Sequence, residues 1–284
     1  RFIKDLSSKN KFHSALKIKL PKKLKFLKFS KDLLREKFDL IVIALSLPGI
    51  DYIGKELKNF NIKTPILVLT KGLKFEKKHN KIFTISEQLK KIYNLKNIFV
   101  LKGPCLAKEL AKKNQTSVII ANKNIKAAKT IGKYISTKYY SIEYSKDVTG
   151  IEVSSAIKNI YSMIIGAGQS LNSSSNLFQK SVGEMRYLIR YFKGKEETIS
   201  GLAGVGDLYV SAAGGRNSKM GSYLGKGYTF KSAKKRFMKK DTVEGEQLAR
   251  EIGPFILKKL DKKKIPLMIS LLKAILNNKK LKII

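Results

Sequence analysis

The stretch DVTGIEVSSAIKNIYSMIIGAG, residues 147–168, determines how the rest of the chain is interpreted. Its apolar residues recur mostly at helical spacing, so we predict one long helix. Nearly every flank of that helix is apolar, and other elements should therefore cover it on all sides. Lys158 lies in its middle, followed by Asn159. Spacing of four places Ser154, Lys158 and Ser162 on one polar strip.

Lys158 has two interpretations at this point. A lysine buried among apolar helices favours the neutral amine, and its pKa falls toward the range in which it exchanges protons. Alternatively, the side chain extends to the surface or pairs with an acid. The helix taken alone favours the second interpretation, and the rest of the chain has to decide.

Composition indicates an ordinary globular protein of about two domains. The chain has 284 residues, of which 43% are hydrophobic. The single cysteine, Cys105, excludes an intramolecular disulfide, so we expect a reducing compartment, the cytoplasm. No apolar run approaches the ~20 residues that a membrane span needs, and no signal peptide opens the chain. Because the sequence begins with Arg1 rather than Met, we expect an N-terminal piece to be missing.

The chain carries a formal charge of +38, which is typical of proteins that bind nucleic acid or an anionic surface. Its lysines are scattered over the whole length, however, and form no basic stripe with interleaved aromatic residues. We therefore interpret the charge as a background bias toward lysine and expect no nucleic-acid partner. The positive field would still attract small anionic substrates.

The first half alternates between strand and helix signals. We predict strands at 16–20, 24–29, 38–46, 65–70, 97–101, 117–121 and 139–145, the 38–46 strand being buried on both faces. Helices are predicted at 51–60, 86–93, 106–113 and 125–137. This alternation predicts a doubly wound, Rossmann-like α/β domain with a parallel sheet, spanning residues 1–146.

Strand signals stop after Asp147. Helices are predicted at 148–168, 176–192, 219–224, 245–252 and 266–277. We therefore expect an all-helical second domain over residues 147–284.

Three turns follow predicted strands, at residues 46–48, 70–72 and 103–105. Ligands of doubly wound sheets bind beyond such strand ends, and glycine there allows the backbone to approach a ligand closely. The fingerprint GxGxxG does not occur between a strand and a helix. Its absence indicates either that no nucleotide cofactor binds or that a first βαβ unit of roughly 30 residues is missing, and the initial Arg1 favours the second explanation.

The helical half carries polar residues in glycine-rich surroundings. Asp207 ends the run 201–207, and Arg216 with Asn217 follows shortly after. A guanidinium grips phosphate oxygens with two parallel donors. A capping aspartate and a surface arginine remain the simpler alternatives. No spacing typical of a metal site is visible, so no metal is expected.

Cys105 would be a thiol nucleophile if a histidine activated it. The two histidines, His13 and His79, lie in charged segments without a matching pattern. We therefore do not favour a Cys–His pair.

The segments ALSLP, TKGL, GPCLAKELA, GIEVSSAIKNIYSMIIGAGQSL, EMRYL, GLAGVGDLYVS, GRN and TVEG follow one another in this order. Together they resemble the bacterial NAD(P)-dependent sn-glycerol-3-phosphate dehydrogenase family over about residues 38–244. The resemblance implies a dinucleotide-binding domain at 1–146 and a catalytic domain at 147–284. It also implies hydride transfer between NAD or NADP and the pair dihydroxyacetone phosphate and sn-glycerol 3-phosphate, supplying glycerophospholipid synthesis.

The resemblance also implies roles for matched positions. Lys158 would be the proton donor and acceptor, and Lys71 would lie between cofactor and substrate. The substrate site would consist of Lys71, Gly103, Cys105, Lys158, Asp207, Gly215, Arg216 and Asn217. The cofactor site would consist of Lys71, Ala107, Arg216, Thr242 and Glu244.

Three features depart from the family pattern. Cys105 and Gly215 stand where the family usually has serine, and the N-terminal glycine fingerprint has no counterpart here. Two alternative functions stay open: a related hydroxyacid or ketopantoate-type reductase with the same two domains, and a basic nucleic-acid-binding module. The choice between NADH and NADPH and the oligomeric state, with a homodimer as one option, also stay open.

Overall fold

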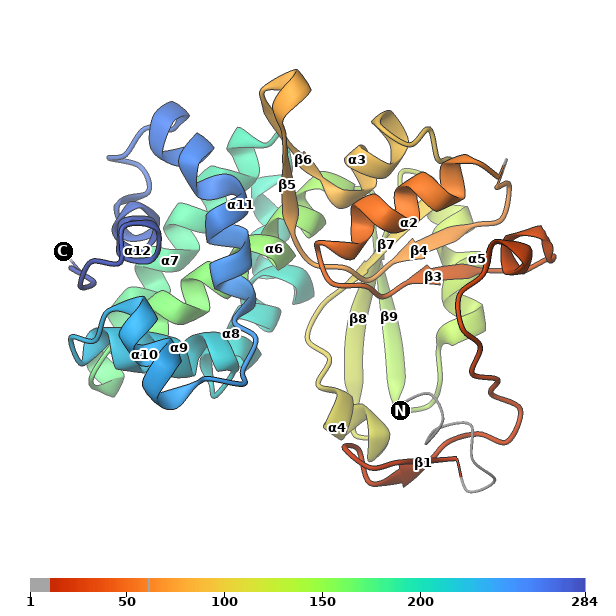
Figure 1. The fold of residues 1–284 in the computed structure, drawn as a ribbon, viewed down its shortest axis with the longest axis horizontal. Coiled ribbons are helices and arrows are strands. Elements are labelled where there is room, and N and C mark those ends of the chain that lie inside the picture. The colour runs from red at the N-terminus through yellow and green to blue at the C-terminus, as the bar shows by residue number, and fades with distance from the viewer. Residues whose placement is uncertain (1–10, 61, 284) are drawn as a thin grey trace.

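A five-stranded sheet and an array of helices lie side by side in the computed structural model, which describes residues 11–60 and 62–283 (Figure 1). The predicted first domain therefore includes eleven residues, 1–10 and 61, that lie outside the described part. The sheet order is β3-β4-β7-β8-β9. These strands are β3 (Ile41–Ile43), β4 (Ile66–Val68), β7 (Ile98–Lys102), β8 (Thr116–Ala121) and β9 (Tyr140–Ser145).

Helices cover both faces of this sheet, as the doubly wound prediction requires. On β4, Ile66 and Val68 pack toward α2 (Gly49–Lys58) and α3 (Ile85–Lys91). The residue between them, Leu67, packs on the opposite side toward α5 (Ile125–Ile135). This alternation follows from the two-residue period of a strand.

The prediction of a parallel sheet is wrong at one pair. Strands β3–β4, β4–β7 and β8–β9 are parallel, but β7 and β8 are antiparallel. A parallel connection needs a crossover element that packs on the sheet. The connecting helix, α4 (Ala107–Ala111), has five residues and buries none of them, so the chain turns back beside β7 instead.

The strand predictions at the beginning of the chain are partly wrong. A small hairpin forms from β1 (Phe12–His13) and β2 (Ile18–Lys19), but residues 24–29 form no strand and are followed by the 3-10 helix η1 (Lys31–Arg35). The strand expected at 38–46 is shorter. It is not buried on both faces, because β3 pairs on one side within the described residues and Val42 is 49% exposed.

One hairpin was not predicted. Strands β5 (Leu73–Glu76) and β6 (Lys81–Thr84) pair antiparallel, joined by a turn that includes the short 3-10 helix η2 (Lys77–His79) and Asn80 in the left-handed conformation. The hairpin stands between the sheet and α11 (Glu244–Lys259) (Figure 1). The backbone N–H of Phe75 donates to Glu251 Oε1 at 3.1 Å, which ties the hairpin to that helix. The alternation in LKFE and KIFT was the available signal.

The helical half is built around α6 (Val148–Gly166), in which residues 150–165 are all buried. The other helical segments are α7 (Leu171–Tyr191), η3 (Glu196–Ser200), η4 (Leu202–Gly206), α8 (Asp207–Ala212), α9 (Arg216–Gly225), α10 (Phe230–Phe237), α11 and α12 (Pro266–Leu276). Helix α10 was not predicted. Asp207 begins α8 rather than ending a turn, because the glycine-rich run itself winds into η4. No helix in the described ranges is long and apolar enough to span a bilayer.

Glycines let α9 approach α6 very closely. A Cβ on Gly221 would lie 1.9 Å from the carbonyl oxygen of Met163, and one on Gly166 would lie 2.2 Å from the carbonyl oxygen of Ser218. Side chains at these two positions would push the helices apart. This contact sets the start of α9 beside the middle of α6, where the polar residues of both helices meet.

Candidate active site

A cleft of about 770 Å³ opens between the carboxyl ends of β3 and β4 and the helices α6, α8, α9 and α11. It brings together residues that are far apart in the sequence. The predicted site residues that line it are Lys71, Cys105, Lys158, Asp207, Gly215, Arg216, Asn217, Thr242 and Glu244.

Two predicted residues do not line the cleft. Gly103 is buried beneath it and contributes its carbonyl oxygen, which accepts a hydrogen bond from Lys71 Nζ at 3.2 Å. Ala107 is exposed at the first position of α4, because the chain leaves the cleft after Leu106. The cofactor contact expected for Ala107 therefore has no counterpart in the geometry of this cleft.

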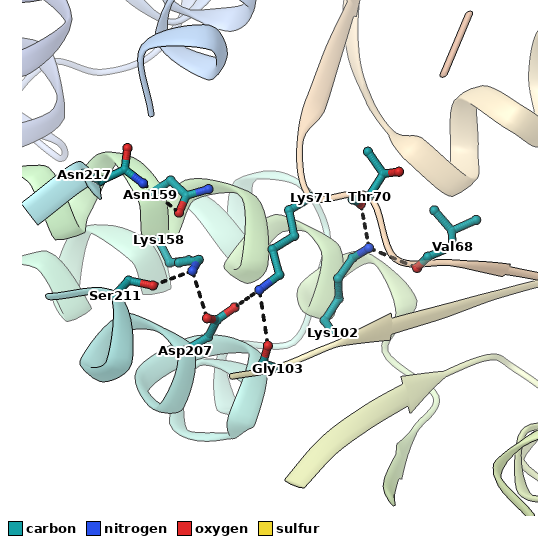
Figure 2. Close-up of polar contacts among 10 residues, drawn as sticks. All are labelled: Val68, Thr70, Lys71, Lys102, Gly103, Lys158, Asn159, Asp207, Ser211 and Asn217. Atoms are coloured by element: carbon teal, nitrogen blue, oxygen red, sulfur yellow. Dashed lines mark hydrogen bonds and ion pairs between the residues drawn. The ribbon is translucent and has the colours of Figure 1, made fainter. Parts of the chain in front are cut away.

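A buried carboxylate joins two lysines on the cleft wall (Figure 2). Lys158 Nζ donates to Asp207 Oδ1 at 2.8 Å and also to the Ser211 hydroxyl. Lys71 Nζ donates to Asp207 Oδ2 at 2.5 Å. Both oxygens of one carboxylate thus hold an ammonium group, so the two amines are fixed relative to each other.

Lys158 does not reach the surface, so that part of the alternative interpretation is wrong, while its other part, pairing with an acid, is confirmed by Asp207. The residue is 7% exposed, in the middle of the central helix α6. Burial lowers the pKa of Lys158 from the ordinary lysine value, and the nearby positive charge of Lys71 lowers it further. The negative charge of Asp207 and its hydrogen bond oppose both effects on this pKa. The amine is therefore easier to deprotonate than a surface lysine, while it still has a counter-ion.

A second set of polar residues lies around the start of α9. Arg216 is half-exposed and pairs with one oxygen of Glu244. The buried Asn217 donates from Nδ2 to Asn159 Oδ1 at 3.1 Å and accepts from the backbone N–H of Gly245 at 2.9 Å. These bonds fix the orientation of the Asn217 amide and connect α6, α9 and α11. The guanidinium at the mouth of the cleft and the amine of Lys158 on its wall face one shared space.

Cys105 lines the cleft, whereas His13 and His79 do not. Partial burial raises the pKa of the Cys105 thiol, although the charge of Lys71 opposes this shift. The thiolate is therefore disfavoured, and nucleophilic catalysis by Cys105 is not supported. In the described part of the chain, no group of three His, Cys, Asp or Glu residues is placed to hold a metal ion.

Sequence reasoning missed one buried charge beside the site, Lys102. It ends the central strand β7, is 2% exposed, and donates to backbone carbonyls of the neighbouring strand end (Figure 2). The signal was present, because a lysine closes the otherwise apolar run IFVLK immediately before the predicted turn at 103–105.

The comparisons with known proteins agree on one family. Residues 1–128 match the model of the NAD-dependent glycerol-3-phosphate dehydrogenase N-terminus, and residues 147–284 match that of the C-terminus. The NADP(+)-dependent glycerol-3-phosphate dehydrogenase of Archaeoglobus fulgidus is 28% identical over 230 residues, which cover 76% of this chain and 68% of that protein. The glycerol-3-phosphate dehydrogenase [NAD(P)+] of Bacillus velezensis is 31% identical over 197 residues, which cover 67% of this chain but 57% of that protein.

Among solved structures, glycerol-3-phosphate dehydrogenase from Coxiella burnetii superimposes with a TM-score of 0.84 at 23% identity. The match covers 98% of this chain and 85% of that one. It shows that the two have the same fold.

Proposed function

Because the chain belongs to the NAD-dependent glycerol-3-phosphate dehydrogenase family, we propose that it interconverts dihydroxyacetone phosphate and sn-glycerol 3-phosphate with NAD or NADP. The observation that carries this proposal is the pair of lysines held by the buried Asp207, with Arg216 in the same cleft. Ketone reduction needs a cation or acid beside the oxygen that becomes negative, and a phosphorylated substrate needs a guanidinium or amide donors. The product would supply glycerophospholipid synthesis.

The cleft fits the nicotinamide end of the cofactor. Its volume of about 770 Å³ lies within the ~300–1,000 Å³ typical of small-molecule sites. It opens at the carboxyl ends of β3 and β4, where ligands of parallel sheets bind. Lys71, Arg216, Thr242 and Glu244 would hold the cofactor there. When bound, the nicotinamide supplies the hydride that reaches the ketone carbon, or accepts it in the reverse direction.

Lys158 gives its proton to the ketone oxygen during reduction and removes it during oxidation. Its lowered pKa suits both directions, because an acid–base group works best when its pKa is not far from the working pH. Lys71 adds positive charge next to the same oxygen, and Asp207 keeps both amines aimed. Water is restricted around these groups because Lys158 and Asp207 are both buried.

The substrate phosphate binds at the start of α9. That helix has no side-chain cap at its N-terminus, so backbone N–H groups of its first turn remain available to an anion. Arg216 lies at its first position and Asn217 follows. Binding of the remote phosphate here orients the reacting carbon toward Lys158.

A steady-state assay tests the proposal with the purified full chain. We expect NADH or NADPH to be consumed when dihydroxyacetone phosphate is added, and not when unphosphorylated ketopantoate replaces it. The variant Lys158→Met should bind the substrate but lose turnover. Absence of both turnover and saturable binding of dihydroxyacetone phosphate would disprove the function. Preference for ketopantoate would favour the alternative reductase.

We also place the activity in the cytoplasm. Cys105 is a free, exposed thiol, and such thiols persist in reducing compartments. The substrate and product are small phosphorylated molecules of central metabolism. Fractionation of cells that express the tagged chain would check this placement.

A further inference from the structure

Lysines at the carboxyl ends of β4 and β7 donate three hydrogen bonds to backbone carbonyls of the opposite strand end (Figure 2). Lys102 Nζ, from the end of β7, donates to the backbone carbonyl of Thr70 at 2.6 Å and to that of Val68 at 3.1 Å. In return, Lys71 Nζ, just after β4, donates to the backbone carbonyl of Gly103 at 3.2 Å. Each strand end is thus held by a lysine of the other.

These bonds lie where the regular pairing of the two strands stops. The β4–β7 register runs from Ile66 with Ile98 to Val68 with Val100. The register of the two strands ends at this pair, and the lysine side chains connect the strand ends beyond it. At this point the buried amine of Lys102 donates to two backbone carbonyls of the β4 end, those of Val68 and Thr70.

Lys102 lies close enough to several charged residues, two of them in the proposed active site, to be affected by their charges. Glu152 on α6, Lys71 and Asp207 all influence its electrostatics. The pKa of Lys102 is lowered to about 7, mainly by burial and also by the charge of Lys71, while Glu152 and Asp207 oppose this shift. A neutral amine has two N–H donors, which matches the two carbonyl acceptors it has.

We infer that Lys102 is a positioning residue: by clamping the Val68 and Thr70 carbonyls it fixes the segment that carries Lys71 and so aims the Lys71 amine at Asp207. The proposal rests on the function proposed above for Lys71 and Asp207. Lys102 itself does not line the cleft, but Thr70, whose carbonyl it holds, does. Thr70 is held on its other side as well, since its hydroxyl donates to the Leu45 carbonyl at 2.7 Å. The β4 end is therefore fixed from both neighbouring strands.

The test compares Lys102→Met with the control Lys133→Met, which removes an exposed lysine of α5. Chemical acetylation of Lys71, followed by peptide mass spectrometry, reports whether its amine is still held. We expect the Lys71 labelling rate to rise about tenfold in Lys102→Met, the factor that corresponds to loss of one charge-assisted hydrogen bond. The control should leave it unchanged. This measurement needs no turnover.

Kinetics supply the second arm. We expect Lys102→Met to lower kcat about tenfold while KM for dihydroxyacetone phosphate changes little, because Arg216 is not displaced. If Lys102 acts through Lys71, the double variant Lys71→Met/Lys102→Met should be no slower than Lys71→Met alone. Lys102→Gln, which keeps an amide donor, should recover part of the rate and serves if Lys102→Met folds poorly.

Three results would overturn the inference. One is an unchanged Lys71 labelling rate in folded Lys102→Met. Another is a lower melting temperature with unchanged kcat, which is the result of a purely structural role. The third is a loss of kcat in the double variant that equals the product of the losses in the two single variants. If the wild-type chain does not reduce dihydroxyacetone phosphate, the proposed function fails, and the labelling rate alone decides whether the clamp exists.

Discussion

Lys71 and Lys158 donate to opposite oxygens of one buried carboxylate, that of Asp207. One lysine comes from the sheet half and the other from the central helix, so the carboxylate joins the two halves of the chain at the cleft. Neither ammonium group could approach the other this closely without that counter-ion, because like charges in a partly dry site repel strongly. In the proposed mechanism, the acid–base chemistry and one contact between the two halves therefore use the same three side chains.

Lys158→Met should remove the proton donor. General acid–base catalysis is worth ~10²–10⁴-fold, so kcat should fall by about that factor. Asp207 keeps Lys71 as a partner, and the protein should stay folded. Stopped-flow or steady-state kinetics at saturating substrate would measure the loss, with Lys133→Met as the exposed control. A kcat within twofold of wild type would exclude Lys158 as the proton donor.

Asp207→Asn should shift the pH profile of kcat. Reduction requires protonated Lys158, so the rate falls as pH rises through the pKa of that amine. Asp207 raises this pKa by its charge and hydrogen bond. Its neutral replacement should therefore move the falling limb to lower pH, and the rising limb of the oxidation reaction should move the same way. If the limb stays in place, a group other than Lys158 titrates.

Arg216→Ala should weaken binding of the phosphorylated substrate. A charge-assisted hydrogen bond contributes about 1.5–3 kcal/mol, so KM should rise by roughly 10- to 100-fold with a smaller change in cofactor affinity. Arg250→Ala is the matched control, since Arg250 forms a similar exposed pair with Glu246 on α11. Equal losses for substrate and cofactor would contradict a phosphate role for Arg216.

The resemblance to the dehydrogenase family implied the residues of the site, and local patterns alone pointed to a few of them without deciding their roles. Lys158 stands out in an apolar helix, and Asp207 and Arg216 flank glycines that mark close packing. All three line the observed cleft. These patterns did not show which of the side chains form ion pairs with one another. No local rule tells that Lys71 and Lys158 meet on one aspartate, since that depends on how β4 and α6 are placed in three dimensions.

The fold was predicted less completely, for physical reasons. The direction of β8 depends on whether α4 packs on the sheet, and a five-residue helix gives little periodicity from which to judge. The β5–β6 hairpin is short and docks on α11, so its stability comes from tertiary contacts such as the Phe75 bond to Glu251. Lys102 was overlooked because burial of a lysine is visible only when its carbonyl partners are known.

Glu184→Ala should destabilise the helical half. The buried Glu184 carboxylate on α7 accepts from the Tyr161 hydroxyl at 2.9 Å and from the backbone N–H groups of Leu267 and Met268 at 2.7 and 3.0 Å. It therefore caps α12 and links it to α6 and α7. Removing it leaves three donors without a partner, which should cost about 3 kcal/mol.

Urea unfolding would measure the effect of Glu184→Ala. The control Glu196→Ala breaks a more exposed pair with Arg190 and should change the free energy of unfolding by less than about 0.5 kcal/mol. Equal effects for the two variants would show that the cap adds no stability.

Lys102→Met should change how stability depends on pH. The pKa of Lys102 is about 7 in the folded protein and near its ordinary value of 10.5 in the unfolded chain. Between these values the unfolded state binds more protons, so this residue makes the free energy of unfolding rise with pH, by at most about 1.4 kcal/mol per pH unit. Below about pH 7 Lys102 is protonated in both states, so it no longer makes the free energy of unfolding depend on pH.

The difference in free energy of unfolding between wild type and Lys102→Met should therefore grow in favour of wild type from about pH 7 to about pH 9. Other titrating groups, including Lys158, are present in both proteins and largely cancel in the difference. Lys133→Met should show a flat difference over the same range, because its lysine is exposed. Urea titrations at several pH values measure all three proteins. A flat difference for Lys102→Met would mean that Lys102 stays charged in the folded state, and its clamp would then be that of an ammonium group with one donor unused.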